Sequence, residues 1–238
     1  MKLYKYIKKE YAIKMMQEGE ILIGTLYDFR QQEHKEIGDK NEGTKKSITD
    51  FPEGALIKDG KEWESKLGHL KRSNISYVKG EVKIEPKTKF IGIDDVPDAY
   101  VYCTSQIYDP GLKSRFSDAT CIEICDPEIF SKEILKELVA RELTYNLCLR
   151  DKCRYIGHNV DYTIQTTAHF LKDPDKYMHQ VEYRFVFPPV IKNGDKIIQP
   201  IVKKENGIIT GIELPKTDVK IVPIIIKCRE AIKYCNMK

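Results

Sequence analysis

Short runs of apolar and β-branched residues recur along this chain, and they constrain its fold more than any other feature. Clear examples are Ala99–Ser105 and Ala119–Pro127, and the second alternates its side chains with the period of two that a strand requires. Only Pro127–Leu149 carries a long helical pattern, after a proline suited to a first helical turn. The helices do not alternate regularly with the strands, as they would in a parallel sheet. We therefore predict an α+β fold with a largely antiparallel sheet.

Length and composition fit one folded domain. The chain has 238 residues, of which 41% are hydrophobic and 32% charged, and no internal repeat or low-complexity tract is visible. This length suffices to bury one sizeable core and does not demand a second. We expect a single domain that covers residues 1–238.

The N-terminal part predicts a strand at Leu3–Ile7 and then a helix from about Glu10 to Gln17 that ends at Gly19. A second strand is expected over Ile21–Phe29. The polar, glycine-punctuated stretch 30–46 has neither period, which indicates a long surface loop. Long loops of this kind are either part of a site or disordered.

The C-terminal part predicts a short helix over 166–179 that breaks before Pro174. A strong strand, Gln180–Phe187, follows and is stopped by two prolines. The last expected elements are hairpin-like strands around Gly194 and Gly207, and an apolar strand within Val219–Cys228.

Charge, cysteine use and hydropathy narrow the class of protein. Lysine and arginine total 40 against 36 acidic residues, so the net charge of +4 gives no overall attraction to nucleic acid or anionic membrane. Seven cysteines form an odd set without the spacing of a disulfide scaffold, and we expect them to be reduced. No apolar run approaches the roughly 20 residues that span a bilayer, and the N-terminal sequence lacks a signal-peptide core. We therefore expect a soluble cytoplasmic protein that does not bind membranes.

The strand Gln180–Phe187 carries the best candidate site. With strand alternation, Gln180, Glu182 and Arg184 share one face. One interpretation is a polar, solvent-facing side of an edge strand with a contact between Glu182 and Arg184. The other makes Glu182 catalytic, because a carboxylate there can bind a ribose hydroxyl and stabilise positive charge at the anomeric carbon. Gln180 would then orient the acceptor.

Two other segments could complete such a site. Thr104 and Ser105 end a strand with adjacent hydroxyl groups, which suit either the wall of a nucleotide pocket or a simple turn. Arg30 lies beside the aromatic Tyr27 and Phe29, a pairing suited to diphosphate binding and base stacking, or to an ordinary surface stack of arginine on an aromatic ring.

Taken in order, these segments resemble the Arg/Ser/Gln-x-Glu layout of the ADP-ribosyltransferases. They resemble still more a bacterial domain family of uncharacterised function, with a Lys-Tyr first strand, a strand ending in Cys-x-Ser, a Gly-x-x-Cys-Ile-x-Ile-Asp-Pro stretch and a final aromatic-x-x-Glu-x-Glu-Tyr-Arg strand. The matching segments here are Lys5-Tyr6, Cys103-Thr104-Ser105, Cys121 to Pro127, and Tyr177 to Arg184.

The resemblance implies a split, mainly antiparallel β-sheet core with peripheral helices and transfer of ADP-ribose from the co-substrate NAD, without a metal. Glu182 and Gln180 would be catalytic; the residues implied in NAD binding are Lys5, Tyr6, Arg30, Thr104 and Ser105. Gln180 occupies the position where the family has an acidic residue. In transferases, a Gln-x-Glu motif goes with acceptors other than arginine, including nucleobases, whereas Glu-x-Glu goes with arginine. The expected acceptor is a nucleic acid, RNA before DNA, or a protein. The expected role is that of a bacterial toxin or anti-phage effector, with an antitoxin or immunity protein as its partner.

Other chemistries remain open from sequence. A zinc site would draw on Cys121, Cys125, Cys148, Cys153 and His158, although none of these matches a repeated close cysteine pair. A metal-dependent nuclease would draw on Asp94, Asp95, Glu123 and Glu182, with Lys113 nearby. A cysteine nucleophile would pair Cys103 with His158, His169 or His179.

The main non-enzymatic alternative is a module that binds a nucleotide or a partner in the same pocket without turnover. Its nucleic-acid contacts would be the basic pairs Lys45-Lys46, Lys71-Arg72 and Lys203-Lys204, although short basic pairs are usually solvated surface.

Overall fold

The fold combines an eight-stranded sheet with several helices and smaller sheets. The structure is a computed structural model that describes residues 1–31, 38–68, 79–116, 119–161, 166–193, 196–205, 208–213 and 221–238. The strands of the main sheet, in spatial order, are β16 (Ile224–Lys227), β2 (Glu20–Thr25), β7 (Tyr100–Ser105), β1 (Leu3–Ile7), β8 (Thr120–Ile124) and β17 (Cys235–Met237), with β11 (Glu182–Phe187) and β9 (Leu149–Lys152) joined to β7. Every pair in this sheet is antiparallel, which confirms the expected α and antiparallel β composition.

The main sheet divides along one edge of β7. β7 pairs with β2 at Val101 and Tyr100, but with β1 only at Ser105. Its other edge pairs with β11 along its whole length. β1 and β2 therefore diverge opposite the middle of β7, and we call this gap the split.

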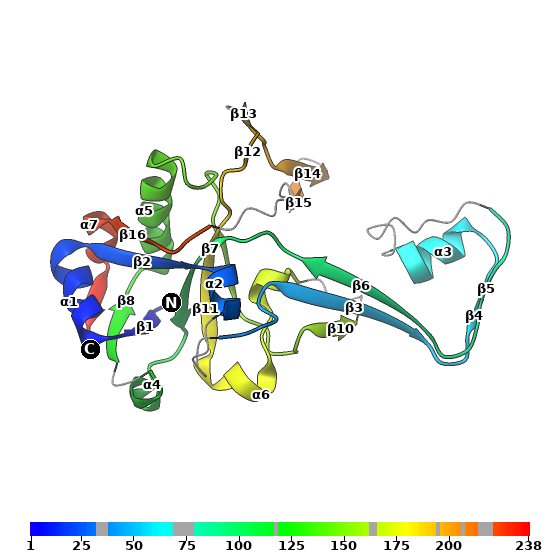
Figure 1. The fold of residues 1–238 in the computed structure, drawn as a ribbon, viewed down its shortest axis with the longest axis horizontal. Coiled ribbons are helices and arrows are strands. Elements are labelled where there is room, and N and C mark those ends of the chain that lie inside the picture. The colour runs from blue at the N-terminus through cyan, green and yellow to red at the C-terminus, as the bar shows by residue number, and fades with distance from the viewer. Residues whose placement is uncertain are drawn as a thin grey trace.

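Three helices pack against the main sheet: α1 (Lys9–Glu18), α5 (Pro127–Ala140) and α7 (Arg229–Ile232). α5 begins where the Asp126 carboxylate accepts the amide hydrogen of Ile129 (3.0 Å), and α1 ends at Gly19 in the left-handed conformation. Together with the main sheet these helices form what we call the body (Figure 1).

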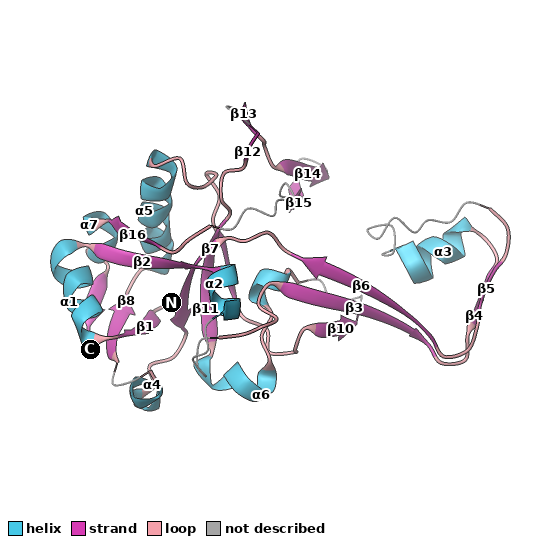
Figure 2. Cartoon of the chain, viewed as in Figure 1, coloured by secondary structure: helices cyan, strands magenta, loops and turns pink. Residues whose placement is uncertain are grey.

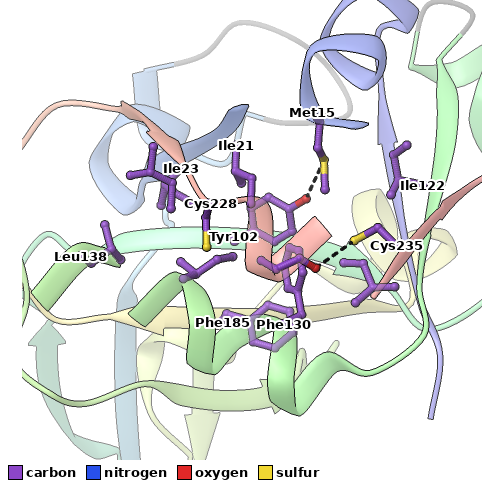
Figure 3. Packing of buried hydrophobic residues seen from close by; sticks show 14 of the residues in the cluster. Met15, Ile21, Ile23, Tyr102, Ile122, Phe130, Leu138, Phe185, Cys228 and Cys235 are labelled. Carbon is purple, nitrogen blue, oxygen red and sulfur yellow. Dashed lines mark hydrogen bonds between the residues drawn. The ribbon is translucent and has the colours of Figure 1, made fainter. Parts of the chain in front are cut away.

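The core of the body lies between these helices and the sheet. Figure 3 shows Tyr102, Phe130 and Phe185 packed together, with ring centroids 5.4 to 6.4 Å apart. Phe130 and Phe185 are fully buried. This cluster joins α5 to the two strands, β7 and β11, that carry the candidate residues.

A second region extends away from the body as a long β ribbon (Figures 1 and 2). Its sheet has the order β10 (Asn159–Asp161), β3 (Thr44–Phe51), β6 (Thr88–Asp95), and β10 pairs with β3 in parallel. The end of the ribbon carries β4 (Ala55–Ile57), α3 (Gly60–Leu67) and β5 (Val82–Ile84) around a separate small core. We call β3, β6 and β10 the arm, and β4, α3 and β5 the tip lobe.

The remaining described elements are short. They are α2 (Leu26–Gln31), α4 (Pro110–Arg115), α6 (Pro174–Tyr177), the 3₁₀ turns η2 (Ala168–Phe170) and η3 (Met178–Gln180), and the hairpins β12 (Lys192–Asn193) with β13 (Lys196–Ile197) and β14 (Ile201–Glu205) with β15 (Ile208–Glu213). Within the described ranges, no helix has the length and apolar character needed to cross a membrane.

Several expected boundaries are wrong. The helix expected over Pro127–Leu149 ends at Ala140, where Glu142 adopts a left-handed conformation (φ 55°), and Leu149 begins β9. The strand predicted over Ile21–Phe29 ends at Thr25, and α2 follows because the Asp98 carboxylate accepts the amide hydrogen of Tyr27 (2.9 Å). The predicted loop 30–46 gives way to β3 at Thr44. Pro174 begins α6 instead of ending a helix, since Asp173 caps the turn and proline suits its first position.

Candidate functional site

A cavity of about 540 Å³ occupies the split. Its walls come from β1, β7, β2 and α1, and its lining combines aromatic rings, lysines and the Glu182 carboxylate. The predicted site residues that line it are Lys5, Tyr6, Thr104, Ser105, Gln180 and Glu182. Arg30 is not among the described residues that line this cavity.

Glu182 begins β11 and lies directly opposite Ser105 on β7. Cross-strand neighbours on one face have their Cβ atoms about 5 Å apart, so this register brings the carboxylate beside the serine. Ser105 Oγ also accepts the amide hydrogen of Ile107 (3.2 Å). Thr104 follows strand alternation to the other face, where its hydroxyl donates to the Tyr183 carbonyl (2.9 Å).

Gln180 does not lie on the strand with Glu182, which corrects the expected common face of Gln180, Glu182 and Arg184. It ends the turn η3, and Val181 between them adopts a left-handed conformation (φ 43°, ψ 52°). A β-branched residue is strained in this region. The main chain is held there because the Val181 carbonyl accepts hydrogen bonds from the Gln106 amide (2.9 Å) and side chain (3.3 Å). The turn still leaves both Gln180 and Glu182 on the cavity wall.

Glu182 belongs to a cluster of four buried charged side chains. Arg184 Nε donates to Glu182 Oε1 at 2.6 Å, and the same guanidinium binds the Glu42 carboxylate through two nitrogens. Lys172 Nζ lies 3.1 Å from Glu42 Oε2 and 3.5 Å from Glu182 Oε2. Arg184 and the Glu42 carboxylate are fully buried. We call these four residues the ion cluster.

The ion cluster keeps the Glu182 carboxylate charged. Burial by itself raises the pKa of this carboxyl, but the charges of Arg184 and Lys172 outweigh it and lower the pKa to about 2. The contact between Glu182 and Arg184 expected from sequence is present, yet it is buried instead of solvent-facing. The positive charges of Arg184 and Lys172 balance the negative charges of Glu42 and Glu182, so none of these groups is an uncompensated buried charge.

Lys5 bridges the split. Its ammonium donates to the Cys103 carbonyl (2.7 Å) and lies 4.7 Å from the centre of the Tyr102 ring. Burial lowers the pKa of this ammonium group. Lys5 therefore satisfies a β7 carbonyl at the point where no neighbouring strand of the described chain does so.

Aromatic side chains line the β1 side of the cavity. Tyr6 stacks parallel to Phe116 with centroids 6.2 Å apart, and its hydroxyl accepts the amide hydrogen of Asp109 (2.7 Å). Burial raises the pKa of Tyr6 to about 12, so its hydroxyl stays protonated. Tyr4 and Phe29 add further rings to the lining. Flat apolar walls of this kind suit an aromatic ligand.

Arg30 is engaged elsewhere. From α2 its guanidinium stacks on Tyr27, 4.0 Å from the ring centre, and it donates to the Glu42 carbonyl and the Asp95 carboxylate. These contacts tie α2 to the end of β6. The surface stack of arginine on an aromatic ring, one of the two interpretations from sequence, is therefore present.

Sequence analysis missed Glu42 and Lys172. Glu42 lies in the stretch 30–46, whose length was the one available signal. Lys172 follows η2 in a segment with no motif, and its Nζ also lies 4.3 Å from the Tyr177 ring centre. Lys172 contacts Glu182 directly, from ten residues earlier in the chain. Glu42 is linked to Glu182 through Lys172 and Arg184, from a segment far away in sequence.

Two buried histidines flank the ion cluster. His158 interacts with Asp39 (Nε2 to Oδ2, 3.2 Å) and the Thr44 carbonyl (Nδ1 to O, 2.8 Å). Burial lowers the pKa of His158, but these two hydrogen bonds outweigh it and raise the pKa overall. His169 Nδ1 lies 2.7 Å from the Thr167 hydroxyl, while burial and then the charge of Arg184 lower its pKa to about 4.

The metal and cysteine chemistries gain no support in the part of the chain that the structure describes. No group of three or more histidine, cysteine, aspartate or glutamate side chains is placed there to hold a metal ion. Glu123 instead pairs with Lys2 (2.7 Å) and Lys238 (3.0 Å). Burial raises the pKa of Cys103 to about 12, so this thiol is not an activated nucleophile.

The three basic pairs do not form a described surface together. Lys45 is buried, and its ammonium donates to the Thr166 carbonyl (3.4 Å). Lys71 and Arg72 lie outside the described residues. Lys203 and Lys204 lie on β14.

Comparison with known proteins adds no family to this geometry. No protein-family model matches the sequence, and searches of curated proteins and of solved structures find no significant match.

Proposed function

We propose that this protein is an NAD-dependent ADP-ribosyltransferase with its active site in the split. The observation that carries the proposal is the cavity itself, whose lining includes the ionised carboxylate of Glu182 and five other residues chosen from sequence: Lys5, Tyr6, Thr104, Ser105 and Gln180. The divided antiparallel sheet agrees with the fold that the resemblance implies.

The residues present fit a dinucleotide. The cavity volume of about 540 Å³ lies in the range of small-molecule sites. Tyr4, Tyr6 and Phe29 offer flat surfaces for an aromatic ring. Lys5, whose ammonium has donors beyond its bond to Cys103, is one of four lysines in the lining, and we assign it the contact to a phosphate.

Glu182 performs the central electrostatic task in this mechanism. NAD supplies an activated ribose: its C1′–N bond breaks, nicotinamide leaves with the electron pair, and the acceptor forms the new bond to C1′ while releasing its proton to water. The Glu182 carboxylate, ionised at neutral pH, stabilises the positive charge on the ribose and accepts a hydrogen bond from its hydroxyl. The ion cluster holds this carboxylate in one orientation, which avoids reorganisation during the reaction.

Gln180 and Ser105 complete the site. Gln180 supplies a neutral amide that both donates and accepts hydrogen bonds, which suits a nucleobase better than a guanidinium. Ser105, opposite Glu182, contributes the wall on the nicotinamide side. We propose a nucleic-acid acceptor, RNA before DNA, with protein as the alternative, and the role of a bacterial toxin or anti-phage effector neutralised by a partner protein.

Labelled NAD tests the proposal directly. Purified protein is incubated with NAD labelled in the adenylate part and with separate pools of RNA, DNA and cell protein. We expect label in one pool, and Glu182→Gln to reduce transfer roughly 100-fold or more. Glu123→Gln is the matched control, because Glu123 is a buried carboxylate of the same sheet that does not line the cavity.

A second variant separates loss of chemistry from loss of folding, since Glu182 also belongs to the ion cluster. Gln180→Ala leaves the four charges intact, and we expect it to lose transfer to the acceptor while nicotinamide release into water continues. Absence of NAD binding by the folded wild-type protein would overturn the proposal.

The second candidate is a nucleotide-binding module without turnover. One observation favours it: both Glu182 oxygens already have cationic partners, at 2.6 and 3.5 Å. NAD binding at micromolar concentration without label transfer or nicotinamide release would select this candidate.

A further inference from the structure

The outer strand of the arm, β6, presents an apolar edge. Among the described strands, β6 pairs only with β3, and the ladder joins all eight of its residues. Its side chains alternate between half-buried and exposed, and the exposed set is Lys89, Ile91, Ile93 and Asp95. Ile91 and Ile93 are 58% and 63% exposed.

An exposed edge of this length is unusual for a protein that works as a monomer. Unpaired main-chain groups along an edge strand form a template for another strand, and proteins normally shorten, bulge or cover such edges. β6 is regular over its eight residues, and Ile91 and Ile93 place two large apolar side chains at its centre. These features indicate that a strand from another polypeptide pairs with β6 and extends the sheet of the arm.

The exposed face of β6 is complementary to itself. If two copies of β6 run antiparallel about a two-fold axis at Gly92, Ile91 of each copy faces Ile93 of the other. In the same register, Lys89 of each copy faces Asp95 of the other. Opposite charges and branched apolar side chains are favourable cross-strand pairs.

Neighbouring registers lose this match. An axis at Ile91 would place Lys89 against Ile93, and an axis at Ile93 would place Asp95 against Ile91. Only the axis at Gly92 pairs apolar with apolar and positive with negative, and a closed two-fold contact of this kind uses the same patch on both copies.

We propose that the protein forms a two-fold dimer by antiparallel pairing of β6, which joins the two arms into one continuous sheet. Because β6 starts at the tip lobe and ends near the body, antiparallel pairing directs each tip lobe toward the body of the other copy (Figure 1). The occupant is a second copy of this chain, because the charges at the two ends of the strand complement each other.

Charge reversal tests this interface. Lys89→Asp places two acidic side chains opposite each other at both ends of the dimer strand pair, and Asp95→Lys does the same with basic ones. We expect sedimentation velocity of the full chain to show a dimer, and each single variant to raise the dissociation constant about tenfold or more. Lys83→Asp, which changes a comparable surface ion pair of the tip lobe (Lys83 to Glu85, 3.0 Å), is expected to leave the dimer intact.

Mixing the two variants separates pairing between copies from effects within one chain. Lys89 also pairs with Asp50 (3.1 Å) and Asp95 with Arg30, so each reversal disturbs its own arm. In a mixed dimer, however, every acidic position faces a basic one, and equal amounts of the two variants are expected to recover dimers. A monomer at all concentrations up to about 100 μM, or dimers insensitive to both variants, would overturn the proposal, as would a mixture that stays monomeric.

Discussion

The body and the tip lobe both combine strands with helical segments, but the strands of the body come from segments much farther apart in the sequence. The body joins segments from both ends of the chain around a continuous core. Among the residues that the structure describes, the tip lobe has four buried apolar side chains, from Ile57 to Ile84. In a large core, many contacts fix the position of each strand, whereas a small core supplies only marginal stability.

The difference shows where a site can be built. The left-handed Val181 and the ion cluster lie next to the main sheet of the body, where surrounding structure holds unfavourable arrangements in place. Glu182 and Arg184 belong to β11, and Glu42 and Lys172 reach this cluster from connecting segments. Among its described residues the tip lobe has no buried charged side chain, and the left-handed Lys87 (φ 66°) lies just outside it, between β5 and β6. We therefore expect perturbations of the body to act globally and those of the tip lobe to stay local.

The largest expected effect comes from breaking the ion cluster. Arg184→Met leaves the Glu42 and Glu182 carboxylates close together without their main partner, and we expect the free energy of unfolding to fall by about 5 kcal/mol. Urea denaturation followed by circular dichroism measures it. Glu42→Gln in the same chain removes one carboxylate and should recover part of the loss. A single variant as stable as the wild type would contradict the role given to this cluster.

Two aromatic deletions compare the cores directly. Phe130→Ala removes a fully buried ring of the body and should lower global stability by about 4 kcal/mol. Trp63→Ala should abolish amide protection in the tip lobe while the main sheet keeps its protection. Hydrogen exchange with mass spectrometry distinguishes the two. Loss of protection across the body in the Trp63 variant would show that the two regions fold as one unit.

The two buried histidines predict opposite responses to pH. The pKa of His169 in the body is lowered to about 4, so the unfolded chain binds the proton first and stability falls as pH drops from about 6.5 to 4, by about 3 kcal/mol. The pKa of His158 at the base of the arm is raised, so its contribution is present below about 6.5 and is lost as pH rises through the raised value. Unfolding free energies at a series of pH values measure both. His169→Gln should flatten the acidic limb, whereas His158→Gln should not.

The smallest expected effect is a change at the start of α3. The Asp59 carboxylate accepts the amide hydrogens of Lys61 and Glu62, each at 2.9 Å. Asp59→Ala should destabilise the tip lobe by about 1 kcal/mol and leave the unfolding midpoint of the body unchanged. Exchange rates of the α3 amides provide the measurement. The surface pair of Lys66 and Glu62 is the control, because Lys66→Ala should have a smaller effect still.

Periodicity predicted the regular part of the body. Strands β7 and β8 and helix α1 lie close to their predicted positions, because their apolar patterns match the burial that they have. Helix α5 starts at the predicted Pro127 but ends at Ala140, nine residues before the expected end. The strand prediction was wrong after Thr25, because a short apolar run suits a strand and a helix equally well. There the hydrogen bond from the Tyr27 amide to the Asp98 carboxylate favours the helix.

The candidate site divides in the same way. Glu182 and Arg184 share a face because strand alternation requires it, and their contact was part of one of the two interpretations from sequence. The depth at which they are buried, the turn at Val181 that separates Gln180 from the strand, and the partners Glu42 and Lys172 came only from tertiary structure. The physical reason is that alternation acts between neighbours in the chain, whereas burial and charge pairing depend on which distant segments meet. Sequence determined that Glu182 and Arg184 share a face of β11, and the fold decided that the Glu182 carboxylate lies among buried charges beside a cavity.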